Sequence, residues 1–231
     1  MNNKIKKILR KKGKSKIVSL TAYSKSVARL LDKYCDIVLV GDSMANVLYG
    51  QENTHQISLQ NIIEHSLSVK KGLNKSLLVV DMPKGSYRNK LIAKKNANLI
   101  KKETKCDAVK LENNKDNFKI IKELVTSKIP VVGHIGYTPQ FKKKFKVEGK
   151  THKEIKRLLK EALKIERAGA FAIVLECVSE NCAKEITKKL SIPTIGIGSS
   201  KFCDGQILVT DDMLGLSGFY PKFVKKYVSL N

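Results

Sequence analysis

The sequence predicts a (β/α)8 or TIM barrel, a closed ring of eight parallel strands that alternate with helices. Short apolar runs rich in β-branched residues alternate with longer amphipathic segments along the whole chain, which is typical of βα units around a parallel sheet. The chain has 231 residues, of which 42% are apolar. This length suits one barrel with a substantial core and leaves too little chain for a second domain, so we expect residues 1–231 to form a single domain.

Eight runs have the length and composition of buried strands, and no linker rich in Gly, Ser or Pro separates them. In chain order, the predicted strands are Lys16–Ala22, Asp36–Gly41, Ser76–Val80, Ala108–Leu111, Val131–Gly133, Ala172–Leu175, Thr194–Gly198 and Gln206–Val209.

The clearest helix lies between the fifth and sixth predicted strands. Thr151 and Glu154 form a capping-box pattern at its start, and Gly169 marks its end. At the beginning of the chain, Ile5, Ile8 and Leu9 recur at helical spacing among seven basic residues, which predicts a basic N-terminal helical segment across the bottom of the barrel. The other predicted helices are Ser26–Lys33, Ser58–Lys71, Lys90–Lys102, Asp116–Ser127 and Glu180–Leu190.

The chain is strongly basic, with 45 Lys and Arg against 21 Asp and Glu, a formal net charge of +24. Such a charge makes a nucleic-acid-binding protein one alternative. The lysines are spread over the whole chain, however, aromatic residues make up only 6%, and no nucleic-acid-binding motif is recognisable. We therefore favour a solvated basic surface and expect no nucleic-acid partner.

The sequence also predicts a cytoplasmic protein without a membrane partner. No apolar run approaches the ~18 residues that a transmembrane helix needs, and the N-terminus lacks the apolar segment of a secretory signal. The five cysteines are an odd number and form no C-x-x-C pair, which indicates reduced, packed thiols: Cys35, Cys106, Cys177, Cys182 and Cys203.

Polar and charged residues stand at the ends of five consecutive predicted strands. The carboxyl ends of parallel strands meet on one face of a barrel, where the active sites of this fold lie, so we expect these side chains to converge. An Asp after a strand often only begins a turn, but the same coincidence at strand after strand is harder to explain that way. The residues are Asp42 and Ser43, Asp81, Lys110 with Glu112, His134, and Glu176.

Three of these residues predict a metal site. Asp42, Asp81 and Glu112 in one small volume would repel one another unless a cation lay between them. Oxygen ligands without a Cys/His cluster favour Mg²⁺ over Zn²⁺. A Mg²⁺ ion with open positions could chelate the keto and carboxylate oxygens of a 2-oxo acid and make the adjacent carbon acidic. Lys110 points to the same side of its strand as Glu112 and is a candidate anchor for such a substrate.

An ordered set of segments resembles the ketopantoate hydroxymethyltransferase family over nearly the whole chain. The segments are Val-Gly-Asp-Ser (40–43), Asp-Met-Pro (81–83), Val-Lys-Leu-Glu (109–112), Gly-His-Ile-Gly-Tyr-Thr-Pro-Gln (133–140), Leu-Glu-Cys-Val (175–178), Ile-Pro-Thr-Ile-Gly-Ile-Gly (192–198), Asp-Gly-Gln-Ile-Leu-Val (204–209) and Pro-Lys-Phe (221–223).

The resemblance implies a barrel of the phosphoenolpyruvate/pyruvate-binding type and a reaction of pantothenate biosynthesis. In that reaction 5,10-methylenetetrahydrofolate donates a hydroxymethyl group to 3-methyl-2-oxobutanoate, giving 2-dehydropantoate and tetrahydrofolate through a Mg²⁺-stabilised enolate. By the same resemblance, Glu176 is the proton acceptor and His134 stands where the family has an active-site histidine. The resemblance also implies a homo-oligomer, which is a decamer in the family. It implies a Mg²⁺ site whose ligands are Asp42, Asp81 and Glu112. The oxo-acid contacts that it implies are Asp42, Ser43, Asp81 and Lys110.

A Mg²⁺-dependent 2-oxo acid lyase or mutase of the same fold is the nearest alternative. The segments Val-Lys-Leu-Glu (109–112) and Gly-His-Ile-Gly-Tyr-Thr-Pro-Gln (133–140) favour the transferase. No Cys-bearing lyase signature is evident. Gly196 and Gly198 could suggest a phosphate cradle, but the third glycine of a dinucleotide fingerprint is missing, so we expect close packing there instead. Lys142–Lys144 form either a solvated charge run or a patch that attracts the polyglutamate tail of folate.

Overall fold

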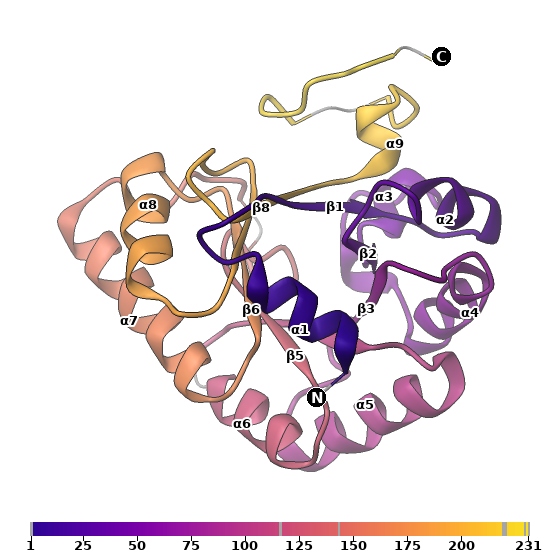
Figure 1. Cartoon of the computed structure of the whole chain (residues 1–231), viewed down its shortest axis with the longest axis horizontal. Coiled ribbons are helices and arrows are strands. Elements are labelled where there is room, and N and C mark those ends of the chain that lie inside the picture. The colour runs from indigo at the N-terminus through magenta and orange to yellow at the C-terminus, as the bar shows by residue number, and fades with distance from the viewer. Residues whose placement is uncertain (1, 116, 143, 219–220, 229, 231) are drawn as a thin grey trace.

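The computed structural model describes residues 2–115, 117–142, 144–218, 221–228 and 230. Its eight strands pair in sequence order and in parallel, and β1 pairs with β8, which closes the ring (Figure 1). The predicted barrel is therefore confirmed. The strands are β1 (Ile17–Thr21), β2 (Ile37–Val40), β3 (Leu77–Asp81), β4 (Ala108–Glu112), β5 (Val131–Gly136), β6 (Ala172–Glu176), β7 (Thr194–Ile197) and β8 (Gly205–Leu208).

The predicted strand boundaries agree with the structure to within one residue, except at the end of β5. That strand was expected to end at Gly133 but continues to Gly136. Gly133 lies inside the strand because α7 packs closely on it: a Cβ there would lie 2.5 Å from the Cγ2 of Ile165. The glycine therefore allows a close approach between helix and strand and does not end the strand.

Helices lie around the outside of the barrel (Figure 1). The capping box at Thr151 and Glu154 is present at the start of α7, as predicted. Three short helical segments were not predicted, because four residues or fewer show no helical periodicity; they are α3 (Met44–Val47), η1 (Thr54–Gln56) and α9 (Thr210–Met213). The predicted helices are α1 (Asn3–Arg10), α2 (Lys25–Leu31), α4 (Leu59–Lys70), α5 (Lys90–Thr104), α6 (Phe118–Thr126), α7 (His152–Arg167) and α8 (Glu180–Lys189), while the predicted start at Asp116 lies outside the described residues.

Alternation along the strands divides the core into two layers, because successive side chains of a strand point to opposite faces. One face packs against the helices, with Val38, Val40, Leu78 and Val80 among its members. The other face fills the interior of the barrel, with Ile37, Leu39, Leu77, Val79, Ala108, Val132, Ala172, Val174, Ile195 and Ile207.

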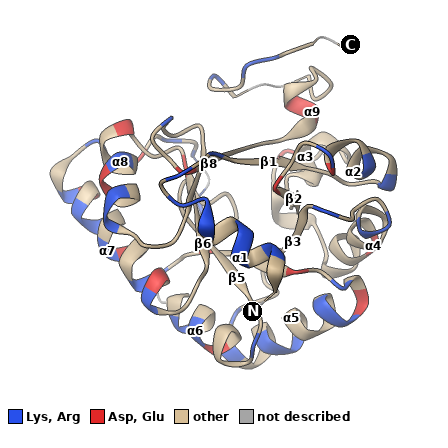
Figure 2. Ribbon diagram, viewed as in Figure 1, with Lys and Arg blue, Asp and Glu red and all other residues tan. Residues whose placement is uncertain are grey.

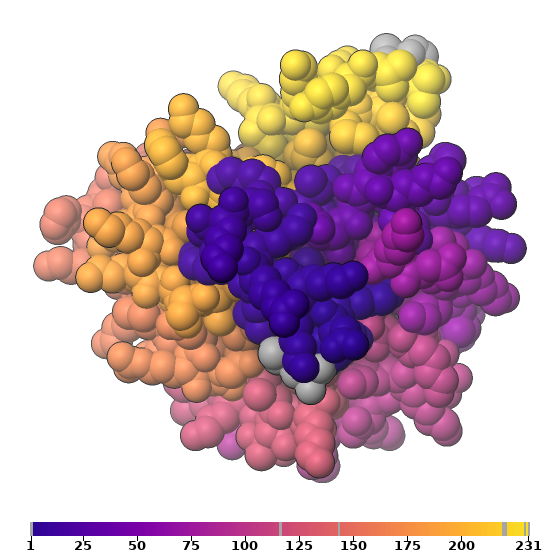
Figure 3. Space-filling model, in the orientation of Figure 1, coloured from indigo at the N-terminus to yellow at the C-terminus, as the bar shows by residue number. Residues whose placement is uncertain are grey.

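Helix α1 closes the bottom of the barrel, as the spacing of its apolar residues predicts. Ile5 and Ile8 are 1% and 2% exposed and belong to the same apolar cluster as the strand interior. In the view of Figure 1, α1 lies across the barrel, and Figure 3 shows the atoms of the N-terminal segment covering the middle of this face.

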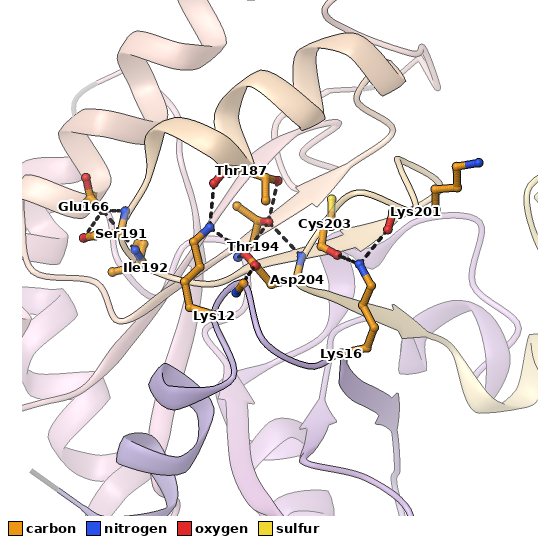
Figure 4. A network of polar contacts seen from close by, with 11 residues as sticks. Lys12, Lys16, Glu166, Thr187, Ser191, Ile192, Thr194, Lys201, Cys203 and Asp204 are labelled. Carbon is orange, nitrogen blue, oxygen red and sulfur yellow. Dashed lines mark hydrogen bonds and ion pairs between the residues drawn. The ribbon is translucent and has the colours of Figure 1, made fainter.

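Lysines of the N-terminal segment attach it to the starts of three strands. Each lysine pairs with an aspartate that immediately precedes a strand, so the three carboxylates face the same end of the barrel. Figure 4 shows one of these attachments, at the start of β8. The pairs are Lys11–Asp36 at 2.7 Å, Lys4–Asp107 at 3.8 Å and Lys12–Asp204 at 2.8 Å.

Many of the other basic residues lie on the outer helices, and Figure 2 shows them on helices on several sides of the barrel, such as α2, α5, α7 and α8. Within the described residues, no helix combines the length and apolar character needed to span a membrane.

Candidate active site

The same alternation that fills the barrel interior brings the predicted site residues together. On each of four neighbouring strands, the inward-pointing positions are apolar at the start and charged or polar at the carboxyl end. The polar ends therefore form a layer directly above the apolar interior. This layer contains Asp81 of β3, Lys110 and Glu112 of β4, His134 of β5 and Glu176 of β6.

The centre of the site is a buried ion pair between neighbouring strands. The Nζ of Lys110 lies 2.7 Å from the Oδ2 of Asp81, and both side chains are almost inaccessible. Burial raises the pKa of Asp81 to about 7, although Lys110 lies beside it. Burial opposes the charge on Lys110 as well, but the surrounding carboxylates outweigh it and raise the pKa of the ammonium group, which stays protonated.

Glu112 and Asp42 are connected by one residue, Gln140, that the sequence did not single out. The backbone N–H of Gln140 donates to the Oε2 of Glu112 at 3.1 Å, and its side-chain amide donates to the Oδ2 of Asp42 at 2.8 Å. The same amide donates to the carbonyl of Met82, and its oxygen accepts from the hydroxyl of Tyr87. Gln140 ends the segment 133–140, so its place in that segment was the only signal that could have identified it.

Several carboxylate oxygens and ring nitrogens of this layer lack a hydrogen-bond partner among the described residues. They include the Oδ1 of Asp81, the Oε1 of Glu112 and both ring nitrogens of His134. Burial and the nearby Asp42 raise the pKa of Glu112 well above its usual value. Several carboxyl groups therefore surround the single ammonium group of Lys110, so ionising all of them requires a further cation, and the free oxygens suit a hard one.

The sequence predicted that His134 directly follows a strand. In the structure it lies inside β5, between two carboxylates. Its Nδ1 is 3.7 Å from the Oε1 of Glu112, and its Nε2 is 3.2 Å from the Oε2 of Glu176. Burial, together with the positive charge of Lys110, lowers the pKa of His134 well below its usual value. The imidazole is therefore neutral and lies beside Glu176.

Glu176 ends β6, and its side chain is 17% exposed, so it remains open to the mouth of the barrel. Burial raises the pKa of Glu176 to about 7, against the attraction of Lys110. The next residue, Cys177, has a φ of 50°, which is uncommon for a residue with a side chain and turns the chain sharply. On β5, Gly136 has a φ of +96°, and a Cβ there would lie 2.1 Å from the carbonyl oxygen of Glu176.

Ser43 and Asp42 lie at the start of α3, just beyond β2. The hydroxyl groups of Ser43 and Tyr23 are hydrogen-bonded at 2.8 Å. Asp42 is 5% exposed and raises the pKa of both Asp81 and Glu112 by its charge. All the predicted site residues therefore lie at one end of the barrel, and Asp42 reaches this end from the loop after its strand.

The described residues contain no group of three His, Cys, Asp or Glu side chains arranged to hold a metal ion. Lys110 occupies one oxygen of Asp81, and Gln140 binds Asp42 and Glu112. The site with Asp42, Asp81 and Glu112 as ligands therefore stays a prediction, supported by their mutual electrostatic influence and by the two free carboxylate oxygens.

The lysine-rich loop after β5 is attached to the barrel at its beginning. Lys142 donates to the carbonyl of Gly136 at 2.6 Å and pairs with Glu148, which also pairs with Arg157. Lys142 thus has a structural role, while Lys144 is exposed and Lys143 lies outside the described residues.

Glycines at the end of β7 pack closely, as expected, and form no phosphate cradle. A Cβ on Gly196 would lie 3.1 Å from the Sγ of Cys203, and one on Gly198 would lie 2.4 Å from the ring of Phe223.

Comparisons of the sequence with known proteins show which family it resembles. Residues 2–231 match the model of the family described as ketopantoate hydroxymethyltransferase. The chain is 52% identical over 230 residues to a 3-methyl-2-oxobutanoate hydroxymethyltransferase of Pelagibacter ubique, covering 100% of this chain and 90% of that one. It is 48% identical over 223 residues to the enzyme of the same name from Anaplasma marginale, covering 95% and 80%.

Solved structures with a similar fold are much less similar in sequence. A phosphonopyruvate hydrolase matches with a TM-score of 0.69 and 11% identity, covering 90% of this chain and 80% of that one. A 2,3-dimethylmalate lyase of the phosphoenolpyruvate mutase/isocitrate lyase superfamily matches with a TM-score of 0.61 and 16% identity, covering 84% and 72%. These likenesses concern the fold, and the lyase and mutase alternative agrees with this chain in fold only. On the match over residues 2–231 and the identity to its relatives, the chain belongs to the ketopantoate hydroxymethyltransferase family.

Proposed function

We propose that this chain transfers a hydroxymethyl group from 5,10-methylenetetrahydrofolate to 3-methyl-2-oxobutanoate. One water is consumed, and the products are 2-dehydropantoate and tetrahydrofolate. The family supports the reaction, and the observation that supports it best is Glu176. This carboxylate has a pKa near 7, is open to the mouth of the barrel, and lies in the same layer as the protonated Lys110. A base with such a pKa is well matched to proton abstraction near neutral pH.

We propose Asp42, Asp81 and Glu112 as the residues that hold Mg²⁺. The crowding of three carboxyl groups around one ammonium group and the free oxygens of Asp81 and Glu112 support this assignment. A phosphonopyruvate hydrolase with a similar fold and 11% identity was solved with oxalate and Mg²⁺, which supports it further. When bound, Mg²⁺ supplies a Lewis acid that polarises the keto oxygen of a 2-oxo acid.

The chain's own residues would bind the oxo acid and move its proton. Lys110 provides a fixed positive charge for the substrate carboxylate, and the hydroxyl of Ser43 is a further oxo-acid contact, as are Asp42 and Asp81. Glu176 takes the proton from C3, and the carbon that loses it then attacks the one-carbon unit of the folate. His134, a substrate contact by resemblance, is a neutral ring whose Nε2 lies 3.2 Å from the Glu176 carboxylate, and both its ring nitrogens are free to bind the oxo acid.

We further propose that residues 1–231 act as one catalytic barrel in the cytoplasm and assemble into a homo-oligomer, a decamer by family resemblance. Five buried thiols outside any disulfide support a reducing compartment.

Exchange of the C3 hydrogen with D₂O tests the role of Glu176. Glu176→Gln retains the shape and hydrogen-bonding groups of the side chain but cannot accept a proton. We expect NMR to show exchange of the 3-methyl-2-oxobutanoate C3 hydrogen in the Mg²⁺-supplied wild-type protein, and a fall on the order of 10²–10⁴-fold in the variant.

Glu123→Gln is the matched control, because Glu123 lies outside the barrel and pairs loosely with Lys94 at 3.7 Å. It should exchange at the wild-type rate. Wild-type exchange in Glu176→Gln, measured at the same folded fraction, would remove Glu176 from the role of base.

A further inference from the structure

Three aromatic rings meet at the end of the barrel where Glu176 lies, two from the loop after β5 and one from the C-terminal segment. Tyr137 follows β5, Phe145 belongs to the loop between β5 and α7, and Phe223 belongs to the C-terminal segment. The ring centroids of Tyr137 and Phe145 are 4.9 Å apart, and those of Phe145 and Phe223 are 6.2 Å apart with an angle of 14° between the rings. Both distances fall within the usual range of about 4.5–7 Å for interacting aromatic pairs.

Contacts with the backbone place Tyr137 and Phe223 at the same end of the barrel as Glu176. The N–H of Tyr137 donates to the carbonyl of Glu176 at 2.8 Å. Phe223 lies directly over Gly198, where a Cβ would come within 2.4 Å of the ring. Gly198 follows Ile197, which is the neighbour of Glu176 in the register of β6 and β7. The three rings therefore lie at the carboxyl ends of β5, β6 and β7, which is the end of the barrel where Glu176 stands.

Phe145 is the exposed member of this cluster. Its side chain is 54% accessible, whereas Tyr137 and Phe223 are only partly so. An exposed aromatic ring on a mobile side chain would ordinarily lose order, but here two other rings restrict it. An exposed aromatic face that is held in place at the active-site end of a barrel is suited to contact a ligand.

We propose that the exposed face of Phe145 stacks on the flat pterin ring of the one-carbon donor, with Tyr137 and Phe223 as positioning residues that hold Phe145 in place. The inference rests on the proposed function, because that reaction requires a pterin to deliver its one-carbon unit to the carbon from which Glu176 has removed a proton. A ring bound on Phe145 would lie at the open side of the site and leave the buried layer around Lys110 to the oxo acid.

The simpler alternative is that the three rings only attach the loop and the C-terminal segment to the barrel. The two ideas differ in what happens when Phe145 becomes Leu, which keeps apolar volume but removes the stacking face. The proposal predicts a rise in KM for 5,10-methylenetetrahydrofolate of about tenfold, within the range found for the loss of one stacked ring. Phe145→Tyr retains the ring and should keep KM within about twofold of the wild type.

Phe202→Leu is the matched control. Phe202 is 39% exposed, lies between β7 and β8, and has the ammonium groups of Lys184 and Lys201 over its ring. It should leave KM for the donor unchanged. An unchanged KM in Phe145→Leu, or an equal rise in Phe202→Leu, would overturn the proposal.

Exchange of the C3 hydrogen separates this inference from the proposed function, because it needs no folate. Absence of exchange in the wild-type protein would count against the function and not against Phe145. Loss of exchange in Phe145→Leu would overturn the stacking role, since the ring would then support the oxo-acid site itself.

Fluorescence gives a direct binding test. The chain contains no Trp, so Phe145→Trp introduces a single reporter at the proposed surface. With Mg²⁺ and the oxo acid present, saturating tetrahydrofolate should quench this emission, and Phe202→Trp should respond much less. Equal responses at the two positions would contradict a specific contact at Phe145.

Discussion

The attachment of α1 to β8 should contribute a large share of the barrel's stability. Asp204 is 6% exposed and accepts four hydrogen bonds. The donors are the Nζ of Lys12 at 2.8 Å, the N–H of Gly13 at 3.0 Å, and the N–H and hydroxyl of Thr194 at 2.9 and 3.1 Å (Figure 4). Lys12 also donates to the carbonyl of Thr187 at 2.7 Å, so this pair joins the N-terminal segment to α8, β7 and β8.

Removing either member of this pair has a cost that can be worked out from the contacts. Asp204→Ala leaves Lys12 without its carboxylate in a nearly closed site, and we expect a loss of about 3–5 kcal/mol in the free energy of unfolding. Lys12→Met leaves Asp204 with its other donors and removes one charged hydrogen bond, for a loss of about 1.5–3 kcal/mol. The double variant should lose less than the sum of the two, by about 0.5–3 kcal/mol.

Urea unfolding followed by circular dichroism measures these differences. Lys94→Met is the control, because it removes a lysine from an exposed pair with Glu123 and should cost about 0–1 kcal/mol. Additive effects of Lys12→Met and Asp204→Ala, within about 0.3 kcal/mol, would refute the idea that the two groups stabilise each other.

The pair also predicts how stability depends on pH. Burial alone would raise the pKa of Asp204, but the hydrogen bonds from Lys12, Thr194 and Gly13 outweigh it and hold that pKa below its usual value. A group whose pKa is lower in the folded state stabilises the protein above its unfolded pKa of about 3.9 and ceases to do so as pH falls through its folded pKa. The stability difference between wild type and Asp204→Asn should therefore be complete at pH 6 and shrink below about pH 4. An equal difference at pH 6 and pH 3 would contradict this account.

Three further predictions concern the active site. Gly136→Ala should unfold at a lower temperature and lose C3 exchange, because the new Cβ would collide with the carbonyl of Glu176. Calorimetry measures the unfolding temperature and NMR measures the exchange. An active, stable variant would refute the clash. Asp42→Asn should lose Mg²⁺-dependent exchange by at least about 10²-fold with little change in Tm, and full exchange would exclude it from the metal site. Asp81→Asn should lose exchange and also about 3–5 kcal/mol of stability, because it leaves Lys110 buried without its partner; an unchanged urea midpoint would show that the ion pair is not needed for folding.

The sequence predicted the barrel and most of the site because both follow from the alternation of side chains along strands. Once Val79 is inside, Asp81 must be inside too, and the same argument carries Lys110 and Glu112 together. These positions needed no knowledge of distant contacts. The end of β5 shows the limit of such reasoning. A glycine at position 133 is typical of a turn in the sequence, and only the structure shows that a helix packs against it inside the strand.

Gln140 and Lys142 could not be assigned a role in this way. Both lie in the irregular chain after β5, where no periodicity fixes the direction of a side chain. The hydrogen bonds of Gln140 to Asp42 and Glu112 join residues far apart in sequence, and the contact of Lys142 with Glu148 depends on the path of the loop. The charge of Lys142 left a solvated charge run and a polyglutamate patch as alternatives, and the structure adds its contacts with Gly136 and Glu148 inside the loop.

The position of α1 has a consequence for the order in which the chain can fold during synthesis. Residues Asn3–Arg10 leave the ribosome long before Asp204, yet Lys12, which directly follows this helix and its C-cap, pairs with Asp204. The pairing of β1 with β8 has the same requirement. Ile5 and Ile8 can thus reach their final burial only after β8 has been made, and contacts between such distant parts of a chain form slowly. Until then these two apolar side chains remain available to chaperones. The helix that closes the bottom of the barrel is therefore among the last elements to be buried.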